Sequence, residues 1–285
     1  MKDEIIITEC PRDAMQGWRD FISTEKKIVY LNLLLECGFD VLDFGSFVSP
    51  KAIAQMRDTA EVLKNLKLND KTKMLAIIAN ERGANDACQF EEIDFLGYPF
   101  SISEEFQKRN INATIEESLG TLEAIQNITL KANKRMVVYL SMGFGNPYGE
   151  HWHPDLVNMW SERLYNEFEI DILALSDTIG SATPEIVEDV FKQIIPALPN
   201  VEFGAHLHAV PENANKIIEA AYKGTCRRFD GAIKGFGGCP MAMDDLTGNM
   251  PTEKLLGFLD DNSIRNQIDK TRFQEAFNMS SSIFI

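Results

Sequence analysis

Two histidines separated by a single residue are the sharpest chemical feature of this 285-residue sequence. His206 and His208 lie in the apolar run 201–208, which we interpret as a strand. Alternate side chains of a strand point to the same face, so both imidazoles can reach one ion. Imidazole combined with carboxylate suits a divalent ion such as Mg²⁺, Mn²⁺ or Zn²⁺ without selecting among them. The alternative is that two inward histidines only fill the interior through hydrogen bonds.

Further polar side chains stand where other apolar runs end. They are Arg12 and Asp13 after the run 4–9, Asp43 within 40–46, and Asp177 and Thr178 at the end of 171–177. If the runs are parallel strands of one barrel, their carboxyl ends meet at a single mouth, where catalytic groups of such barrels lie. We therefore expect these residues to converge with the histidine pair.

Two weaker candidates lie in loops. Cys239 belongs to the glycine-rich stretch 235–240, where a backbone can approach a ligand closely and a thiol could donate a proton. The alternative for Cys239 is a small buried hydrophobic side chain. A second histidine pair, His151 and His153, precedes a predicted helix, and we interpret it as loop packing or a substrate contact rather than a metal site.

The elements that must position these residues alternate along the chain. Short apolar runs predict strands at 4–9, 40–46, 73–79, 93–97, 136–142, 171–177, 201–208 and 228–235. Helical periodicity predicts helices at 24–37, 51–66, 116–133, 154–168, 183–198 and 213–223. Eight strand and helix units in about 260 residues predict an α/β fold, a (β/α)8 TIM barrel, with an extra C-terminal helix at 262–279. A doubly wound open sheet is the alternative, because glycine and lysine interrupt the eighth run.

Composition and charge narrow the function classes. With 45% hydrophobic residues and no linker-like tract, residues 1–285 are expected to form a single domain. A formal net charge of −15 argues against a nucleic-acid or membrane partner, since both need clustered positive charge. Five cysteines, an odd number without CxxC spacing, fit reduced thiols. No signal segment is evident at the first residues, so we expect a cytoplasmic protein.

Several ordered stretches resemble hydroxymethylglutaryl-CoA lyases, members of the DRE-TIM metallolyase superfamily. Each is weak alone, but their common order over most of the chain is specific. The stretches are 11–13 with Gln16, 46–51 with 55–56, 110–112 with 115–118, 177–180 with 183–184, His206 with His208, 237–240, and 248–249 with 252–253.

The resemblance implies a site and a reaction. A divalent metal, Mg²⁺ or Mn²⁺ with Zn²⁺ not excluded, would be held by Asp13, His206, His208 and Asn249. Arg12 would stabilise enolate charge, Cys239 would be the acid, Asp43 and Asp177 would support the site, and Gln16, Ser46 and Thr178 would contact substrate. The expected reaction is cleavage of 3-hydroxy-3-methylglutaryl-CoA or a close 3-hydroxyacyl-CoA to acetyl-CoA and acetoacetate, with Asp13 or His206 as base. An acyl-CoA substrate and a homodimer are implied as partners.

Departures from the family pattern keep alternatives open. The family's glycine after the aspartate is Ala14, its glutamate is Asp43, its polar segment after the histidines reads Ala-Val-Pro-Glu at 209–212, and its cysteine is missing from 143–148. The exact acyl group is therefore open. A condensing enzyme that joins acetyl-CoA to a 2-oxo acid and a non-catalytic acyl-CoA-binding barrel are the two alternatives.

Overall fold

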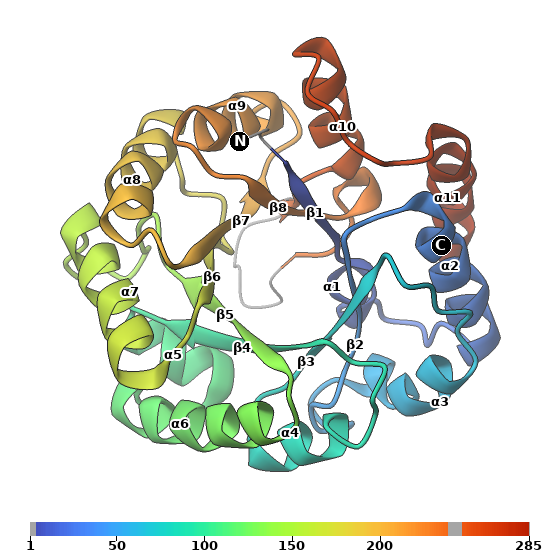
Figure 1. The fold of residues 1–285 in the computed structure, drawn as a ribbon, viewed down its shortest axis with the longest axis horizontal. Helices are drawn as coiled ribbons and strands as arrows, with labels where there is room; N and C mark the ends of the chain where they lie inside the picture. The colour runs from blue at the N-terminus through green and yellow to red at the C-terminus, as the bar shows by residue number, and fades with distance from the viewer. Residues whose placement is uncertain (1–3, 239–246, 285) are drawn as a thin grey trace.

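The barrel expected from the strand pattern is present. The structure is a computed structural model that describes residues 4–238 and 247–284. Within these ranges eight parallel strands follow the order β6-β5-β4-β3-β2-β1-β8-β7, and pairing of β6 with β7 closes the ring (Figure 1). The strands are β1 (Ile6–Glu9), β2 (Val41–Ser46), β3 (Lys73–Ile77), β4 (Phe95–Ser101), β5 (Arg135–Ser141), β6 (Ile172–Asp177), β7 (Glu202–Ala209) and β8 (Arg228–Gly231). Closure excludes the open sheet.

Helices surround the barrel, as Figure 1 shows. They are α1 (Pro11–Gln16), α2 (Thr24–Cys37), α3 (Thr59–Lys64), α4 (Glu81–Ala87), α5 (Glu104–Ile111), α6 (Ile115–Lys131), α7 (Pro154–Phe168), α8 (Pro184–Ala197), α9 (Ala214–Lys223), α10 (Thr252–Asp261) and α11 (Lys270–Ile283), with 3-10 turns η1 (Ala54–Met56) and η2 (Ile233–Gly235). The bounds of α2 and α7 are those predicted. Side chains of Ser23 and His153 accept hydrogen bonds from their first turns, which defines both starts.

Several predicted bounds were wrong, and the fourth strand, for example, runs over Phe95–Ser101 rather than 93–97. The helix predicted at 51–66 is split into η1 and α3. The terminal helix predicted at 262–279 begins only at Lys270, where the Asp269 side chain caps its first turn. The eighth strand ends at Gly231 rather than 235, because the chain turns into η2, with Lys234 at φ 60°. A short strand, β9 (Gly248–Asn249), was not predicted and pairs antiparallel with β7.

Side-chain alternation sets what faces the barrel axis. The inner cluster takes one residue in two from the strands, and these residues are Val41, Leu75, Ile77, Val137, Tyr139, Ile172 and Ala174. Ile6 packs against this inner cluster, whereas Ile7 belongs to the larger cluster under the helices. This alternation places His206, His208 and Asp230 inside the barrel.

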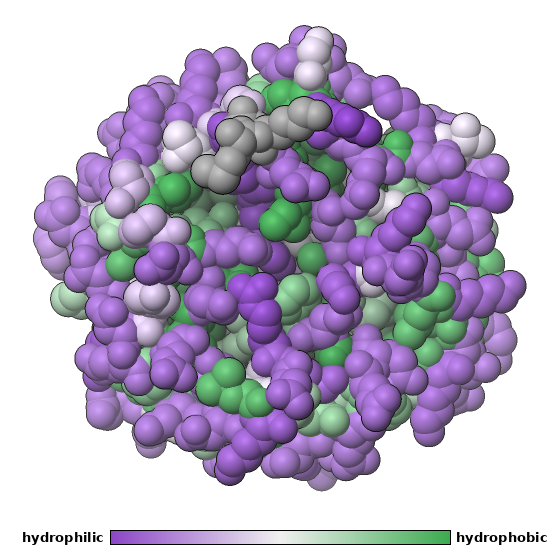
Figure 2. All heavy atoms as spheres, viewed as in Figure 1, coloured by the Kyte–Doolittle hydropathy of each residue, from purple (hydrophilic) through white to green (hydrophobic). Residues whose placement is uncertain are grey.

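The outer surface carries no wide apolar area in the view of Figure 2. Hydrophilic residues dominate that face, and hydrophobic residues form small separate groups. Among the described residues no helix combines the length and hydropathy needed to cross a bilayer.

Candidate functional site

A cavity of about 380 Å³ contains most of the polar residues singled out above. Arg12, Asp13, Gln16, Thr178, His206 and His208 line it together. The remaining wall is largely apolar and comes from Val48, Ile53, Ile77, Pro99, Phe106 and Ile111. The cavity thus combines one charged corner with a surface suited to an acyl chain.

Three side chains that could hold a metal ion meet in the charged corner. Ligand atoms of Asp13, His206 and His208 lie within 4.8 Å of one another, and all three side chains are buried. The strand β7 supplies both histidines, while α1 begins directly after β1 and supplies Asp13. A carboxylate with two imidazoles is a donor set that divalent ions accept.

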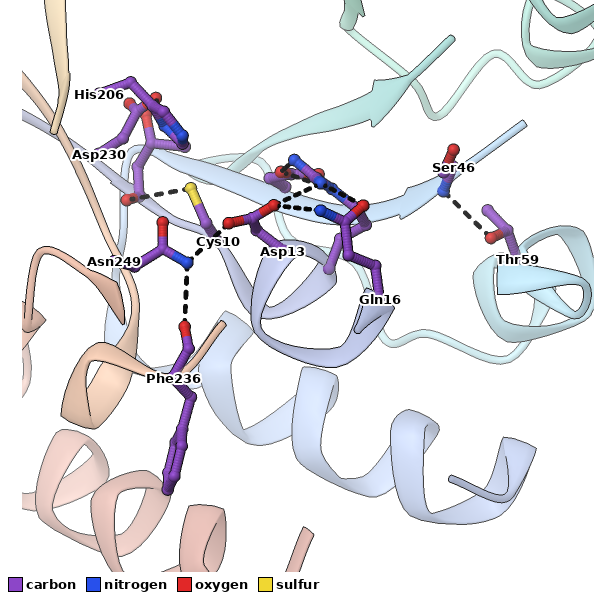
Figure 3. A network of polar contacts seen from close by, with 12 residues as sticks. Cys10, Asp13, Gln16, Ser46, Thr59, His206, Asp230, Phe236 and Asn249 are labelled. Carbon is purple, nitrogen blue, oxygen red and sulfur yellow. Dashed lines mark hydrogen bonds and ion pairs between the residues drawn. The ribbon is translucent and has the colours of Figure 1, made fainter. Parts of the chain in front are cut away.

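The fourth expected ligand is also at this corner. Asn249 pairs with His208 across β7 and β9, and its Nδ2 donates to Asp13 Oδ2 at 2.7 Å (Figure 3). Neither ring nitrogen of the buried His208 makes a hydrogen bond of normal geometry to a described residue. Burial and the neighbouring His206 lower the pKa of His208 to about 4. A buried, neutral imidazole whose Nε2 lies 4.0 Å from the Asp13 carboxylate fits a metal ion.

Arg12 is fixed by a fork of carboxylate contacts. Its Nε and Nη2 donate to Asp43 Oδ2 at 3.0 and 2.6 Å, and its Nη1 donates to Asp13 Oδ1 at 2.8 Å. Gln16 accepts from Nη1 at 2.9 Å and donates to Asp13 Oδ1 at 2.6 Å. Burial alone would lower the pKa of Arg12, but Asp43 and Asp13 raise it. The guanidinium is therefore a permanent, oriented positive charge at the cavity wall.

Protonation of Asp43 is expected to lower the activity at acid pH. Burial raises the pKa of Asp43 to about 6 even though Arg12 opposes the shift. The carboxylate is ionised above pH 6 and loses its charge below it, so the Arg12 contact weakens as the pH falls. At saturating metal we expect kcat/KM to fall about tenfold per pH unit below about pH 6. A pH profile checks this, and Asp43→Asn should remove that limb. An unchanged limb in this variant would assign it to another group.

Asp230 was missed by the sequence analysis. It lies on β8 and its Oδ2 is 3.2 Å from His206 Nδ1. Burial alone would lower the pKa of His206, but the hydrogen bond and charge of Asp230 outweigh it and raise that pKa. A carboxylate on one ring nitrogen fixes the tautomer and directs the other nitrogen to the metal. Its only signal in the sequence is a carboxylate inside the run 228–235, which was predicted as the eighth strand.

Replacing Asp230 by asparagine should weaken metal binding without removing a ligand. We expect Mn²⁺ affinity to fall about 10- to 100-fold, the range typical for partners of metal-binding histidines. Titration of Mn²⁺ monitored by electron paramagnetic resonance measures this directly. An affinity equal to that of the wild type would show that Asp230 does not orient His206.

Tyr139 is a second inward residue that the sequence analysis did not select. It lines the cavity, its ring packs edge-on against His206 at 5.1 Å between centroids, and its buried Oη has no hydrogen-bond partner among the described residues. Burial raises the pKa of Tyr139 well above its usual value. It is therefore a neutral hydroxyl that can donate a hydrogen bond to a ligand.

The structure does not bring every predicted residue into the cavity. The Asp177 carboxylate accepts from the backbone N–H groups of Ile179 and Ala182 and so shapes the loop after β6. Ser46 is buried, and its hydroxyl accepts from the N–H of Val48 rather than lining the cavity. Their predicted roles stay predictions, and Cys239 lies outside the described residues.

His151 and His153 do not lie in the charged corner of the cavity either. His151 is exposed, and His153 Nδ1 caps the start of α7 by accepting from the N–H of Asp155. Neither histidine lines the cavity, and the one contact of His153 that defines a structural role is this helix cap.

Comparisons with known proteins point to one family. The HMGL-like family model matches residues 4–279. A hydroxymethylglutaryl-CoA lyase of Bacillus subtilis is 34% identical over 266 residues, which cover 90% of this chain and 85% of that protein. A crystal structure of the Bacillus subtilis HMG-CoA lyase has a TM-score of 0.92 at 32% identity, covering 99% of this chain and 95% of that one. An HMG-CoA lyase of Acinetobacter baumannii, in complex with coenzyme A and 3-methylmalate, has a TM-score of 0.90 at 27% identity and covers 99% and 92%.

Proposed function

This chain belongs to the HMGL-like family, and from that premise we propose that it is a metal-dependent lyase that cleaves 3-hydroxy-3-methylglutaryl-CoA to acetyl-CoA and acetoacetate. The observation that carries the proposal is the placement of Arg12, held by Asp43, directly beside Asp13 and the paired histidines. Cleavage to an enolate requires a fixed positive charge next to the residues that would hold the metal ion.

The reaction divides into two steps. A divalent ion held by Asp13, His206, His208 and Asn249 would lower the pKa of the substrate's 3-hydroxyl and orient the bond to be broken. Asp13 or His206 removes the hydroxyl proton, the C2–C3 bond breaks, and its electron pair moves onto C2 as C3 becomes the ketone of acetoacetate. The resulting thioester enolate carries its charge beside the Arg12 guanidinium, which stabilises it without reorganising. A proton delivered to C2 then gives acetyl-CoA, and Cys239 is the proposed donor.

The side chains of the cavity wall are proposed to bind the substrate. The apolar side chains of Val48, Ile53 and Phe106 would contact the acyl and pantetheine chain, while the hydroxyl of Thr178, which is buried without a partner among the described residues, would contact the acyl group. Gln16 would act mainly by holding the side chains of Arg12 and Asp13 in place through its hydrogen bonds to both. Ser46 would join the substrate contacts only after its hydroxyl leaves the N–H of Val48.

The metal ion, the substrate class, the location and the oligomeric state are also proposed, each on its own ground. Mg²⁺ or Mn²⁺ is the proposed ion, because carboxylate and amide oxygens accompany the histidines. Coenzyme A thioesters are the proposed substrate class, as in the Acinetobacter baumannii structure that contains coenzyme A. A cytoplasmic location is proposed because Cys10, Cys37, Cys88 and Cys226 are unpaired thiols, as expected in a reducing compartment. A homodimer is proposed from the family alone.

A product assay tests the reaction and its direction together. Purified protein loaded with Mn²⁺ is incubated with 3-hydroxy-3-methylglutaryl-CoA, and acetyl-CoA and acetoacetate are followed by chromatography. A parallel series offers acetyl-CoA with a panel of 2-oxo acids and follows free thiol. Equimolar acetyl-CoA and acetoacetate support the lyase. Thiol release only in the second series would replace it with a condensing enzyme, and thioester binding without turnover would replace it with a binding protein.

A further inference from the structure

Glu9 is a buried carboxyl group that the proposed reaction does not use. It is the last residue of β1 and only 1% exposed. Because Ile7 faces the helices, alternation directs Glu9 outward as well, away from the cavity that Asp13 lines. No cation pairs with Glu9 in the ranges 4–238 and 247–284, so the group is not part of a buried ion pair.

Instead, Glu9 joins the two ends of one segment. Its Oε1 accepts from the backbone N–H of Ile233 at 2.8 Å, and its Oε2 is 2.5 Å from the hydroxyl of Thr252, which donates to it. Ile233 begins η2 and Thr252 begins α10, so nineteen positions of chain separate the two contacts along the sequence, by their numbers. Glu253 adds a neighbouring contact by accepting from the N–H of Lys234 at 2.9 Å.

The segment between these ends carries the fourth metal-binding residue. Asn249 lies on β9, and its Nδ2 donates both to Asp13 Oδ2 and to the carbonyl oxygen of Phe236, at 2.7 and 2.9 Å. A Cβ on Gly237 would lie 2.7 Å from that same nitrogen and 2.8 Å from the Asp13 carbonyl oxygen. The backbone at Phe236 and Gly237 is thus packed directly on Asn249 and Asp13, so we expect a displacement of residues 233–238 to move the Asn249 amide.

We propose that Glu9 is a positioning residue of the metal site, which holds Ile233 and Thr252 in place so that Asn249 meets Asp13 and His208. The inference rests on the metal-dependent function proposed above. Burial raises the pKa of Glu9 to about 8, so near neutral pH the group is mostly protonated and an uncharged glutamine can take its place. A glutamine keeps the Oε1 acceptor for Ile233, and its amide N–H can donate to the Thr252 hydroxyl, which then acts as the acceptor.

Metal affinity separates this role from plain stabilisation of the fold. We measure Mn²⁺ binding by electron paramagnetic resonance at pH 7 in Glu9→Gln, Glu9→Leu, Thr252→Ser and Thr252→Val. We expect the Kd to rise at least about tenfold in Glu9→Leu and in Thr252→Val. Glu9→Gln and Thr252→Ser keep the contacts and should bind like the wild type. The Thr252 pair keeps the test open if Glu9→Leu does not fold.

Lys134→Met is the matched control. This buried lysine makes a comparable clamp far from the metal corner, donating to the carbonyl oxygens of Phe90 and Ile93. Its loss should lower the unfolding temperature but leave the Kd for Mn²⁺ unchanged. Wild-type affinity in Glu9→Leu or in Thr252→Val, or an equal loss in Lys134→Met, would overturn the positioning role alone. A wild-type protein that binds no Mn²⁺ would overturn the metal site itself and this inference with it.

Discussion

Replacement of Arg12 by methionine is expected to lower kcat for 3-hydroxy-3-methylglutaryl-CoA cleavage by at least about 10²- to 10³-fold, the usual cost of removing one preorganised group that stabilises an oxyanion. The charge forms next to a guanidinium that three carboxylate contacts already hold in place. A methionine fills the space without charge, so the enolate would form in an environment dominated by Asp13 and Asp43. Steady-state kinetics measure the loss, and KM should change less than kcat.

Two further variants separate chemistry from folding. Arg12→Lys keeps a positive charge but not the forked contacts of the guanidinium, so its kcat should lie between those of Arg12→Met and the wild type. Arg228→Met removes another buried arginine, which pairs with Glu202 on the opposite, amino-terminal side of the barrel. Its kcat should stay close to that of the wild type. Equal losses in Arg12→Met and Arg228→Met would mean that the effect is on the fold.

Replacement of His208 by alanine is expected to abolish both Mn²⁺ binding and turnover, a loss of at least about 10³-fold in kcat/KM. The imidazole is buried, neutral at pH 7 and without a hydrogen bond of normal geometry to a described residue, so its removal costs the metal a donor and otherwise removes mainly the ring contact with His206. Calorimetric titration with Mn²⁺ measures the binding. The matched control is His153→Ala, because this histidine is exposed and only caps α7.

The two outcomes of the His208 variant have different meanings. Lost turnover with lost Mn²⁺ binding supports a catalytic metal at the histidine pair. Retained Mn²⁺ binding, together with retained turnover, would mean that His206 and His208 only fill the barrel, which was the alternative interpretation of their spacing.

Much of the fold could be predicted from the sequence because the signals were local. The strand runs are short and apolar, and helices such as α2 and α7 start at side chains that cap them. The convergence of Arg12, Asp13, His206 and His208 followed from one rule, the meeting of parallel strand ends at a single mouth.

The remainder depends on tertiary contacts that no local pattern encodes. The helices α1, α4 and α5 have six to eight residues, too few for a clear periodicity. The β9 pairing exists only because the segment after β8 folds back onto β7. Asp230 and Tyr139 stand inside ordinary apolar runs, so their place beside His206 became visible only when the barrel closed. The Asp177 carboxylate accepts from backbone N–H groups of its own loop, which the strand-end rule does not foresee.

The most direct test of metal-dependent cleavage is acetyl-CoA release from 3-hydroxy-3-methylglutaryl-CoA by the purified protein, measured after chelation of metal and again after Mn²⁺ is restored. We expect no release from the chelated protein and full recovery with Mn²⁺, with one acetoacetate formed per acetyl-CoA. Release that continues at the same rate after chelation would contradict the metal-dependent mechanism. Absence of release by the Mn²⁺-loaded protein would contradict the proposed substrate.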